Sequence, residues 1–177
     1  MKSLKHLFGL FLLLISCSLS HAQFNPYSEE AKMLTFGIGV SRWGTPIFAR
    51  YEHPIADNIT VGGTFSYQTE KESYFGYNWK HNIIGIAGRG DYHFNELLKV
   101  NDSWDIYSGA GLGFYVWHTK LDGGIYDDGY AGAGSGGVAL DFHIGGRYFF
   151  NEKFAVNLEL GGGTIISAGT VGVTIVL

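Results

Sequence analysis

The chain has 177 residues, which suits a single domain, and its 12 basic and 16 acidic residues give a net charge of −4. No basic stripe of the kind that binds nucleic acid runs through it, so we expect no nucleic-acid partner. Glycine accounts for 27 residues and aromatic residues for 16%, while helical periodicity is nearly absent. The composition therefore favours an all-β chain.

The first 22 residues predict a secretory signal peptide. Two lysines precede the apolar run Leu7–Ile15, which is too short to cross a bilayer, and a small-x-small cleavage site lies at Ser20–Ala22. A competing interpretation is that Leu14–Cys17 resembles a lipobox, which would lipidate Cys17. Cleavage after Ala22 removes the only cysteine and both lysines, leaving a chain with no disulfide and a net charge of −6.

Residues 23–31 then form an expected periplasmic lead-in, and residues 32–177 form the folded domain. Eight segments of this domain alternate with period two, which is the pattern of a strand whose two faces meet different surroundings. The expected strands are Met33–Val40, Ile47–Glu52, Ile59–Gln68, Ile84–His93, Ile106–Trp117, Val138–Tyr148, Phe154–Gly161 and Val171–Leu177.

Every charge within these strands falls on one face, and the other face is apolar. The charged residues are Arg50, Glu52, Arg89, Asp91, Asp141, Arg147 and Glu159. With the apolar face inside, the chain would be a lipocalin-like soluble barrel, whose outer surface should be rich in lysine and glutamate. The charged face instead has no lysine and a near balance of arginine and carboxylate, which suits a closed interior where each charge needs a partner. We therefore predict that the apolar face meets lipid.

The expected connections alternate between short and long. His53–Asn58, Asn95–Asp105 and Phe149–Lys153 form the shorter set, and Thr69–Asn82 and His118–Gly137 are the longer pair. Outer-membrane barrels have short periplasmic turns and longer external loops, so we expect the longer pair outside the cell.

Aromatic residues recur near the ends of the strands that descend to the short turns. We expect them to form a girdle at one membrane interface, comprising Tyr51, Tyr92, Phe94, Tyr148, Phe150 and Phe154.

With these features the chain resembles the small eight-stranded outer-membrane barrels of the OmpA/OmpX type, the group described as the outer membrane protein beta-barrel domain. The resemblance rests on the signal ending at Ala22, the strand ends Arg89–Tyr92 and Arg147–Tyr148, the strand Tyr107–Phe114 and the end Val171–Leu177. It implies an all-β, eight-stranded antiparallel up-and-down transmembrane β-barrel in the bacterial outer membrane. Lipid, lipopolysaccharide and the barrel-assembly machinery are the implied partners. The family commonly ends in an aromatic residue, where this chain has Leu177.

The inward charges have two interpretations. They can form a salt-bridge network that fills the barrel, since an eight-stranded barrel is just wide enough to be filled by its own side chains. They can also line a narrow channel for small solutes. We favour the network. His93 and His143 share this face without a third ligand fixed by spacing, so we expect neither a metal nor a cofactor.

Lipid A modification is the enzymatic alternative, because it needs a serine, a histidine and an acid near the outer leaflet. His118, Asp122 and Ser135 lie at that rim but show no His-x-Ser arrangement. The glycine-rich spelling from Gly132 to Gly137 precedes a strand, whereas a dinucleotide fingerprint follows one. We therefore predict no enzymatic activity.

The long loop at Thr69–Asn82 is the remaining candidate surface. Its aromatic residues Tyr74, Phe75, Tyr77 and Trp79 lie among charges of both signs, a composition that suits binding of an extracellular protein or glycan. The alternative is that these rings anchor the loop to the bilayer or the barrel rim. The sequence thus predicts a structural or surface-binding role.

Overall fold

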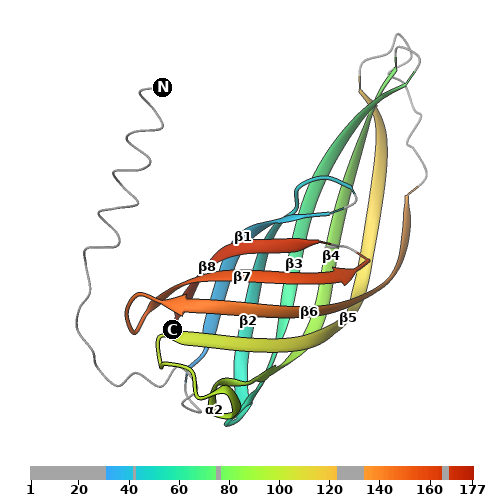
Figure 1. Cartoon of the computed structure of the whole chain (residues 1–177). Coiled ribbons are helices and arrows are strands. Elements are labelled where there is room, and N and C mark those ends of the chain that lie inside the picture. Colours follow the sequence, from blue (N-terminus) through green and yellow to red (C-terminus); the bar gives the residue numbers. More distant parts are fainter. Residues whose placement is uncertain (1–30, 42, 75–76, 123–133, 165–167) are drawn as a thin grey trace, which may run out of the picture.

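The computed structural model describes residues 31–41, 43–74, 77–122, 134–164 and 168–177. Eight antiparallel strands close into a barrel in chain order, with β1 pairing with β8 (Figure 1). The strands are β1 Met33–Val40, β2 Ile47–Ala56, β3 Ile59–Tyr74, β4 Tyr77–His93, β5 Trp104–Asp122, β6 Ser135–Phe149, β7 Phe154–Gly163 and β8 Gly169–Val176. This confirms the predicted eight-stranded up-and-down barrel. The predicted signal peptide and most of the lead-in lie outside the described residues.

Two glycine- and asparagine-dependent connections shape the ends of the barrel. The β1–β2 turn closes with the Ser41 amide donating to the Gly44 carbonyl, and Gly44 has a φ of 109°, which favours glycine. Between β4 and β5 lies the short helix α2, Asn95–Leu98. The Asn95 amide side chain donates to the Trp104 carbonyl and accepts from the Ile106 amide at 2.8 Å. This helix makes the connection longer than the other two at this end of the barrel, and no feature of the sequence pattern predicted it.

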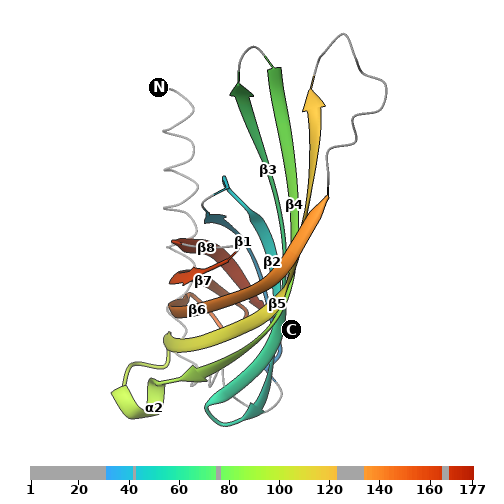
Figure 2. The same ribbon diagram turned by 90° about the vertical axis from the view of Figure 1, so that its right-hand side faces the viewer.

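Strands β3, β4 and β5 continue well beyond their neighbours, and here the predicted loops were wrong. The segment expected as the loop Thr69–Asn82 is a paired hairpin up to Tyr74 and Tyr77, and β5 stays paired with β4 as far as Asp122. Figure 2 shows these three strands rising above the rest of the barrel. By register, one face of the extension carries polar residues and the other mixes charged, polar and aromatic residues, so it lacks the hydrophobic alternation by which a strand is recognised. We call this end the long-loop end, and the opposite end, with α2 and Leu177, the termini end.

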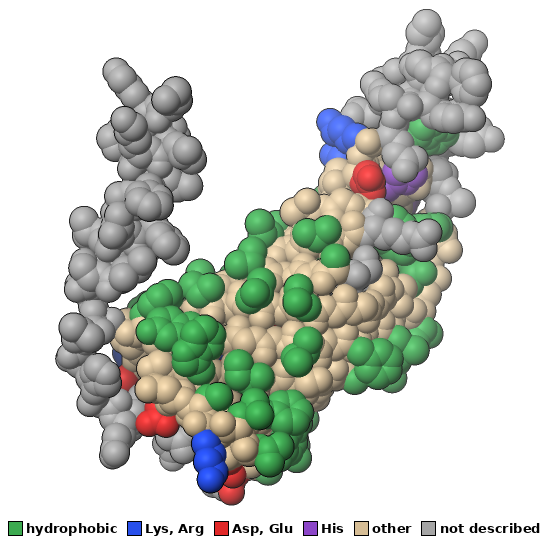
Figure 3. Space-filling model, in the orientation of Figure 1, with side chains coloured by type: hydrophobic (Ala, Val, Ile, Leu, Met, Phe, Trp, Pro, Cys, Tyr) green, Lys and Arg blue, Asp and Glu red, His purple; other side chains and the backbone are tan. Residues whose placement is uncertain are grey.

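Burial is inverted relative to a water-soluble protein. On the outer wall Phe142 is 68% exposed and Ile86 62% exposed, whereas Arg50 is 1% exposed and Arg147 is fully buried. Figure 3 shows hydrophobic side chains spread over the wall, with charged ones near the two ends of this face. No helix among the described residues is long and apolar enough to cross a membrane.

Candidate functional site

The barrel interior holds two ion-paired layers, of which the lower lies toward the termini end. Its centre is Arg147, whose guanidinium donates two bonds to the Glu52 carboxylate and one to Asp105 Oδ2 at 3.0 Å. The other oxygen of Asp105 lies 2.8 Å from His93 Nδ1, and His93 Nε2 lies 3.0 Å from the Thr60 hydroxyl. Glu52, Asp105 and Arg147 are all 0% exposed. This layer is fully removed from solvent.

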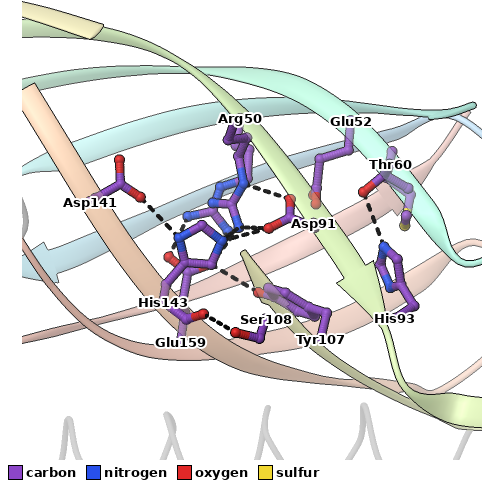
Figure 4. A network of polar contacts seen from close by, with 12 residues as sticks. Arg50, Glu52, Thr60, Asp91, His93, Tyr107, Ser108, Asp141, His143 and Glu159 are labelled. Carbon is purple, nitrogen blue, oxygen red and sulfur yellow. Dashed lines mark hydrogen bonds and ion pairs between the residues drawn. The ribbon is translucent and has the colours of Figure 1, made fainter. Parts of the chain in front are cut away.

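The upper layer is built on Glu159 and Arg89. Arg50 forms a two-pronged bond with the Glu159 carboxylate at 2.8 and 2.9 Å (Figure 4). Arg89 reaches the same carboxylate at 3.0 Å. Arg89 also holds both oxygens of Asp91, at 2.7 and 2.8 Å. Two-pronged arginine–carboxylate bonds fix geometry as well as charge, which makes the layer a rigid crosslink between β2, β4 and β7.

His143 lies between two carboxylates of the upper layer. Its Nδ1 is 2.9 Å from Asp141 Oδ2 and its Nε2 is 2.5 Å from Asp91 Oδ1. A neutral imidazole has one donor nitrogen, so both contacts are hydrogen bonds only when the ring is protonated. Arg89 Nη2 is also 2.5 Å from His143 Nε2. When His143 is protonated, this is a close contact between two cations, and the surrounding carboxylates offset their repulsion.

The charge balance of the described interior also favours a protonated His143 ring. Three arginines, Arg50, Arg89 and Arg147, face five carboxylates, Glu52, Asp91, Asp105, Asp141 and Glu159, and both histidines contact carboxylates. All seven of the predicted interior charges thus lie on the inner face. Asp141 is the least enclosed, with 32% of its side chain exposed.

Three interior residues were absent from the predicted network. Asp105 precedes the expected start of its strand, although it lies two residues before the inward Tyr107 and so falls on the same face. Tyr107 joins the two layers. Its hydroxyl donates to Glu159 at 3.1 Å and accepts from Asn157 at 2.6 Å, while the Arg147 guanidinium carbon lies 4.5 Å from its ring centre. The alternation of faces could have assigned Asp105, Tyr107 and Asn157 to the interior, but their polar partners could not be read from the sequence.

Glycines on β5 and β6 provide the space for these side chains. A β-carbon at Gly109 would overlap Asp91, one at Gly111 would overlap Asp141, and one at Gly145 would overlap the Tyr107 ring. The run of glycines on the inner face of β5 is therefore the complement of the charged side chains opposite it.

A small cavity opens above the upper layer, toward the long-loop end. Small side chains such as Ser66, Ala139 and Thr170 form part of its wall, and Arg50, Arg89 and Glu159 lie against it. The lower layer, fully buried around Tyr107 and Arg147, does not line it. The lower layer therefore closes the cavity on the side of the termini end. We call the cavity the vestibule and the lower layer its floor.

The six predicted girdle residues lie at the termini end of the outer wall. Tyr51, Tyr92, Tyr148 and Phe154 are 39–46% exposed. Tyr92 packs on Phe94 and Tyr148 on Phe150, with ring centres 5.0 and 5.3 Å apart. Trp104, which the prediction did not include, packs against Tyr148 at 5.0 Å.

The predicted binding residues lie on the extension of β3 and β4. Tyr74 and Tyr77 form the last pair of that hairpin and Trp79 pairs with Glu72, whereas Phe75 lies outside the described residues. The enzymatic alternative finds no geometric support in the described part of the rim. His118 shares a face with the outward Val116, whereas Ser135 pairs with Trp117, which occupies the opposite face. No metal-binding group of His, Cys, Asp and Glu occurs among the described residues.

No protein-family model matches the sequence, and no curated protein matches it. Several solved structures are similar to this chain. The N-terminal β-barrel domain of Pseudomonas aeruginosa OprF matches with a TM-score of 0.53 and 13% identity, covering 84% of this chain and 98% of that one. A structure described as a de novo designed transmembrane β-barrel gives 0.51 and 11%, covering 85% and 98%. The attachment invasion locus protein Ail of Yersinia pestis gives 0.47 and 12%, covering 84% and 96%.

Proposed function

We propose that this chain, which has the fold of the small eight-stranded outer-membrane barrels, is a bacterial outer-membrane protein with a closed interior. Its role is structural or surface-binding, exercised through the long-loop end. One observation carries the proposal: a continuous apolar outer wall encloses two layers of paired charges. Such a wall is unfavourable in water and favourable in lipid.

The height of the apolar wall supports the membrane placement. Outward residues of β5 stay apolar or small from Trp104 to Val116. At about 3.3 Å per residue and a tilt of about 40°, twelve residues span about 30 Å, which equals the hydrocarbon core of a bilayer. The aromatic residues at the termini end then fall at one interface, where their amphipathic rings are favoured.

The orientation follows from the unequal ends. Two of the three connections at the termini end, residues 57–58 and 150–153, are short and the third contains α2, whereas β3, β4 and β5 project far past the barrel at the other end. Because outer-membrane barrels have short turns on the periplasmic side, the long-loop end faces outward. Lipid and lipopolysaccharide surround the wall, the barrel-assembly machinery inserts the chain, and Trp79 and its neighbours offer a surface for an extracellular protein or glycan.

The narrow-channel alternative is weakened by the floor of the vestibule. Glu52, Asp105, Tyr107 and Arg147 are each 0% exposed and hold one another by hydrogen bonds and ring contact. A solute crossing this layer would have to break several charge-assisted bonds in a region closed to water. Thr60, His93 and Asp105 form a hydroxyl–imidazole–carboxylate chain, but it lies in this closed layer, out of reach of a substrate, so we propose no enzymatic role.

Two measurements test the proposal. Detergent-folded protein should run faster on a gel before boiling than after it, and protein that stays soluble without detergent would contradict the membrane barrel. In planar bilayers the inserted protein should show no steady unitary current. Clean unitary currents that change when Arg147 is replaced would replace the closed barrel with the channel.

A further inference from the structure

The wall of the vestibule contains polar groups that the interior network does not pair. Within the described part of the chain, Arg50 Nε and the Thr170 hydroxyl are buried and have no hydrogen-bond partner. Arg50 is 1% exposed and Thr170 is 4% exposed, and both residues line the vestibule. Because buried polar groups are nearly always hydrogen-bonded, these two groups point to a bound molecule as their partner.

The chemistry of this wall favours an uncharged partner with hydroxyl groups. The Arg50 Nε–H group can only donate, whereas the Thr170 hydroxyl can donate or accept. Thr64 and Ser66 add two further hydroxyl groups to the lining. The cations and carboxylates of the upper layer balance when His143 is protonated: they are Arg50, Arg89 and His143, and Asp91, Asp141 and Glu159. An added ion would upset this balance, whereas a hydroxyl group accepts and donates without a charge.

Three aromatic rings lie at the mouth of the barrel beside the vestibule. Tyr115 is in one row with Gly85 and Ser66, which line the vestibule. Trp43, in the β1–β2 turn, packs against Tyr115 and Trp117 with ring centres 5.8 and 5.9 Å apart. Because β5 is four strands away from β1 in the closed barrel, this contact reaches across the mouth. We call Trp43, Tyr115 and Trp117 the aromatic rim.

The aromatic rim keeps ring surface available next to the hydroxyl-lined wall. Trp117 is 37% exposed, and Trp43 and Tyr115 are half-buried. Gly137 provides the space for Tyr115, since a β-carbon there would lie 2.9 Å from the Tyr115 hydroxyl. A sugar has apolar C–H faces that pack on aromatic rings and hydroxyl groups that need hydrogen bonds, so an aromatic rim above a polar wall matches both.

We propose that the vestibule and the aromatic rim bind one end of a neutral sugar. A terminal hydroxyl of the sugar accepts from Arg50 Nε and bonds to the Thr170 hydroxyl, while the sugar ring packs on Trp43 and Tyr115. Because the vestibule is small, only the end of the sugar enters it and the ring stays at the aromatic rim. This inference rests on the proposed surface-binding role and gives that role a site and a ligand class.

The test uses the full chain folded in a zwitterionic detergent that contains no sugar. The probes are methyl β-glucoside and methyl β-galactoside, with glucuronic acid as a charged comparison. Saturation-transfer NMR and tryptophan fluorescence measure binding to the unmodified chain, Trp43→Ala and Thr170→Val. The matched controls are Trp104→Ala, in the aromatic cluster at the termini end, and Thr45→Val, at an exposed threonine that does not line the vestibule. The gel shift on boiling first establishes that each protein is folded.

A neutral methyl glycoside should bind the unmodified chain, about tenfold more weakly after Trp43→Ala and about fivefold more weakly after Thr170→Val, which removes one hydrogen bond. Each control should change binding by about twofold or less. No binding of either neutral probe would overturn the sugar site, as would equal binding by the unmodified chain and both rim and wall variants, or tighter binding of glucuronic acid. Absence of the gel shift in the unmodified chain would instead overturn the membrane barrel.

Discussion

Replacing Arg147 with methionine tests whether the lower layer holds the barrel together. The change removes a fully buried guanidinium that bonds to Glu52 and Asp105 and lies over the Tyr107 ring. Asp105 keeps His93, but Glu52 loses the cation that holds both of its oxygens. Leaving one member of a buried ion pair without its partner costs about 3–5 kcal/mol. We therefore expect the free energy of unfolding to fall by about 4 kcal/mol.

Urea unfolding of the lipid- or detergent-folded protein measures this loss, with tryptophan fluorescence and the fraction of compact protein on an unheated gel as two readouts. With a urea dependence of about 2 kcal/mol per molar, the midpoint should fall by about 2 M. Lys153→Met is the matched control, because Lys153 is exposed in the β6–β7 turn, and it should change stability by less than about 0.5 kcal/mol.

A second substitution separates the ion pair from simple loss of packing. Adding Glu52→Met to Arg147→Met removes both charges of the closest pair, and the double variant should be more stable than Arg147→Met alone. The coupling energy from this cycle should reach about 2 kcal/mol, within the range seen for contacting residues. A loss below about 1 kcal/mol for Arg147→Met, or strictly additive effects, would refute the argument.

Three further substitutions or deletions probe other parts of the fold. Gly145→Ala places a methyl group in the space of the Tyr107 ring and should destabilise the barrel by about 1–3 kcal/mol, whereas Gly162→Ala meets nothing within 4 Å and should be neutral; equal urea midpoints would contradict this. Asp105→Asn should lower the free energy of unfolding by about 3 kcal/mol, because it weakens the bonds to Arg147 and His93. Asp102→Asn, at an exposed position, should leave the urea midpoint unchanged. Deleting Val173–Leu177 removes the residues of β8 that pair with Met33–Phe36 and with Val156 and Phe154, so the barrel cannot close; normal accumulation of the truncated protein in the membrane would show that closure is not needed.

Alternation was sufficient to predict the barrel because its strands separate two unlike environments. Phe142 and Arg147 lie on opposite faces of one strand, and that contrast predicted the strand and the direction of its faces. The extensions of β3 to β5 were missed for the same reason. Around Lys71 and Lys80 one face is polar and the other mixes charged residues with Trp79, so neither face is uniformly apolar, and pairing between strands holds the hairpin.

The interior charges could be assigned to one face, but their partners could not. Arg147 and Glu52 are 95 residues apart, and which carboxylate each arginine meets depends on barrel stagger and on the space left by glycines. Asp105 was missed because the strand was expected to begin at Ile106. Its neighbour Tyr107 was assigned inward, yet its part in joining the two layers depends on contacts with Glu159 and Arg147 across the barrel.

The glycines of β5 and β6 impose a rule of exchange on any variant of this barrel. Gly111 and Asp141, and Gly145 and Tyr107, each divide one fixed volume between a missing and a present side chain. A larger residue in place of a glycine is accommodated only when its partner becomes smaller, because a closed ring of strands cannot widen at one point. The two members of each pair can therefore be changed only together, and a designer who wants a hollow barrel must shorten the second member while keeping the first.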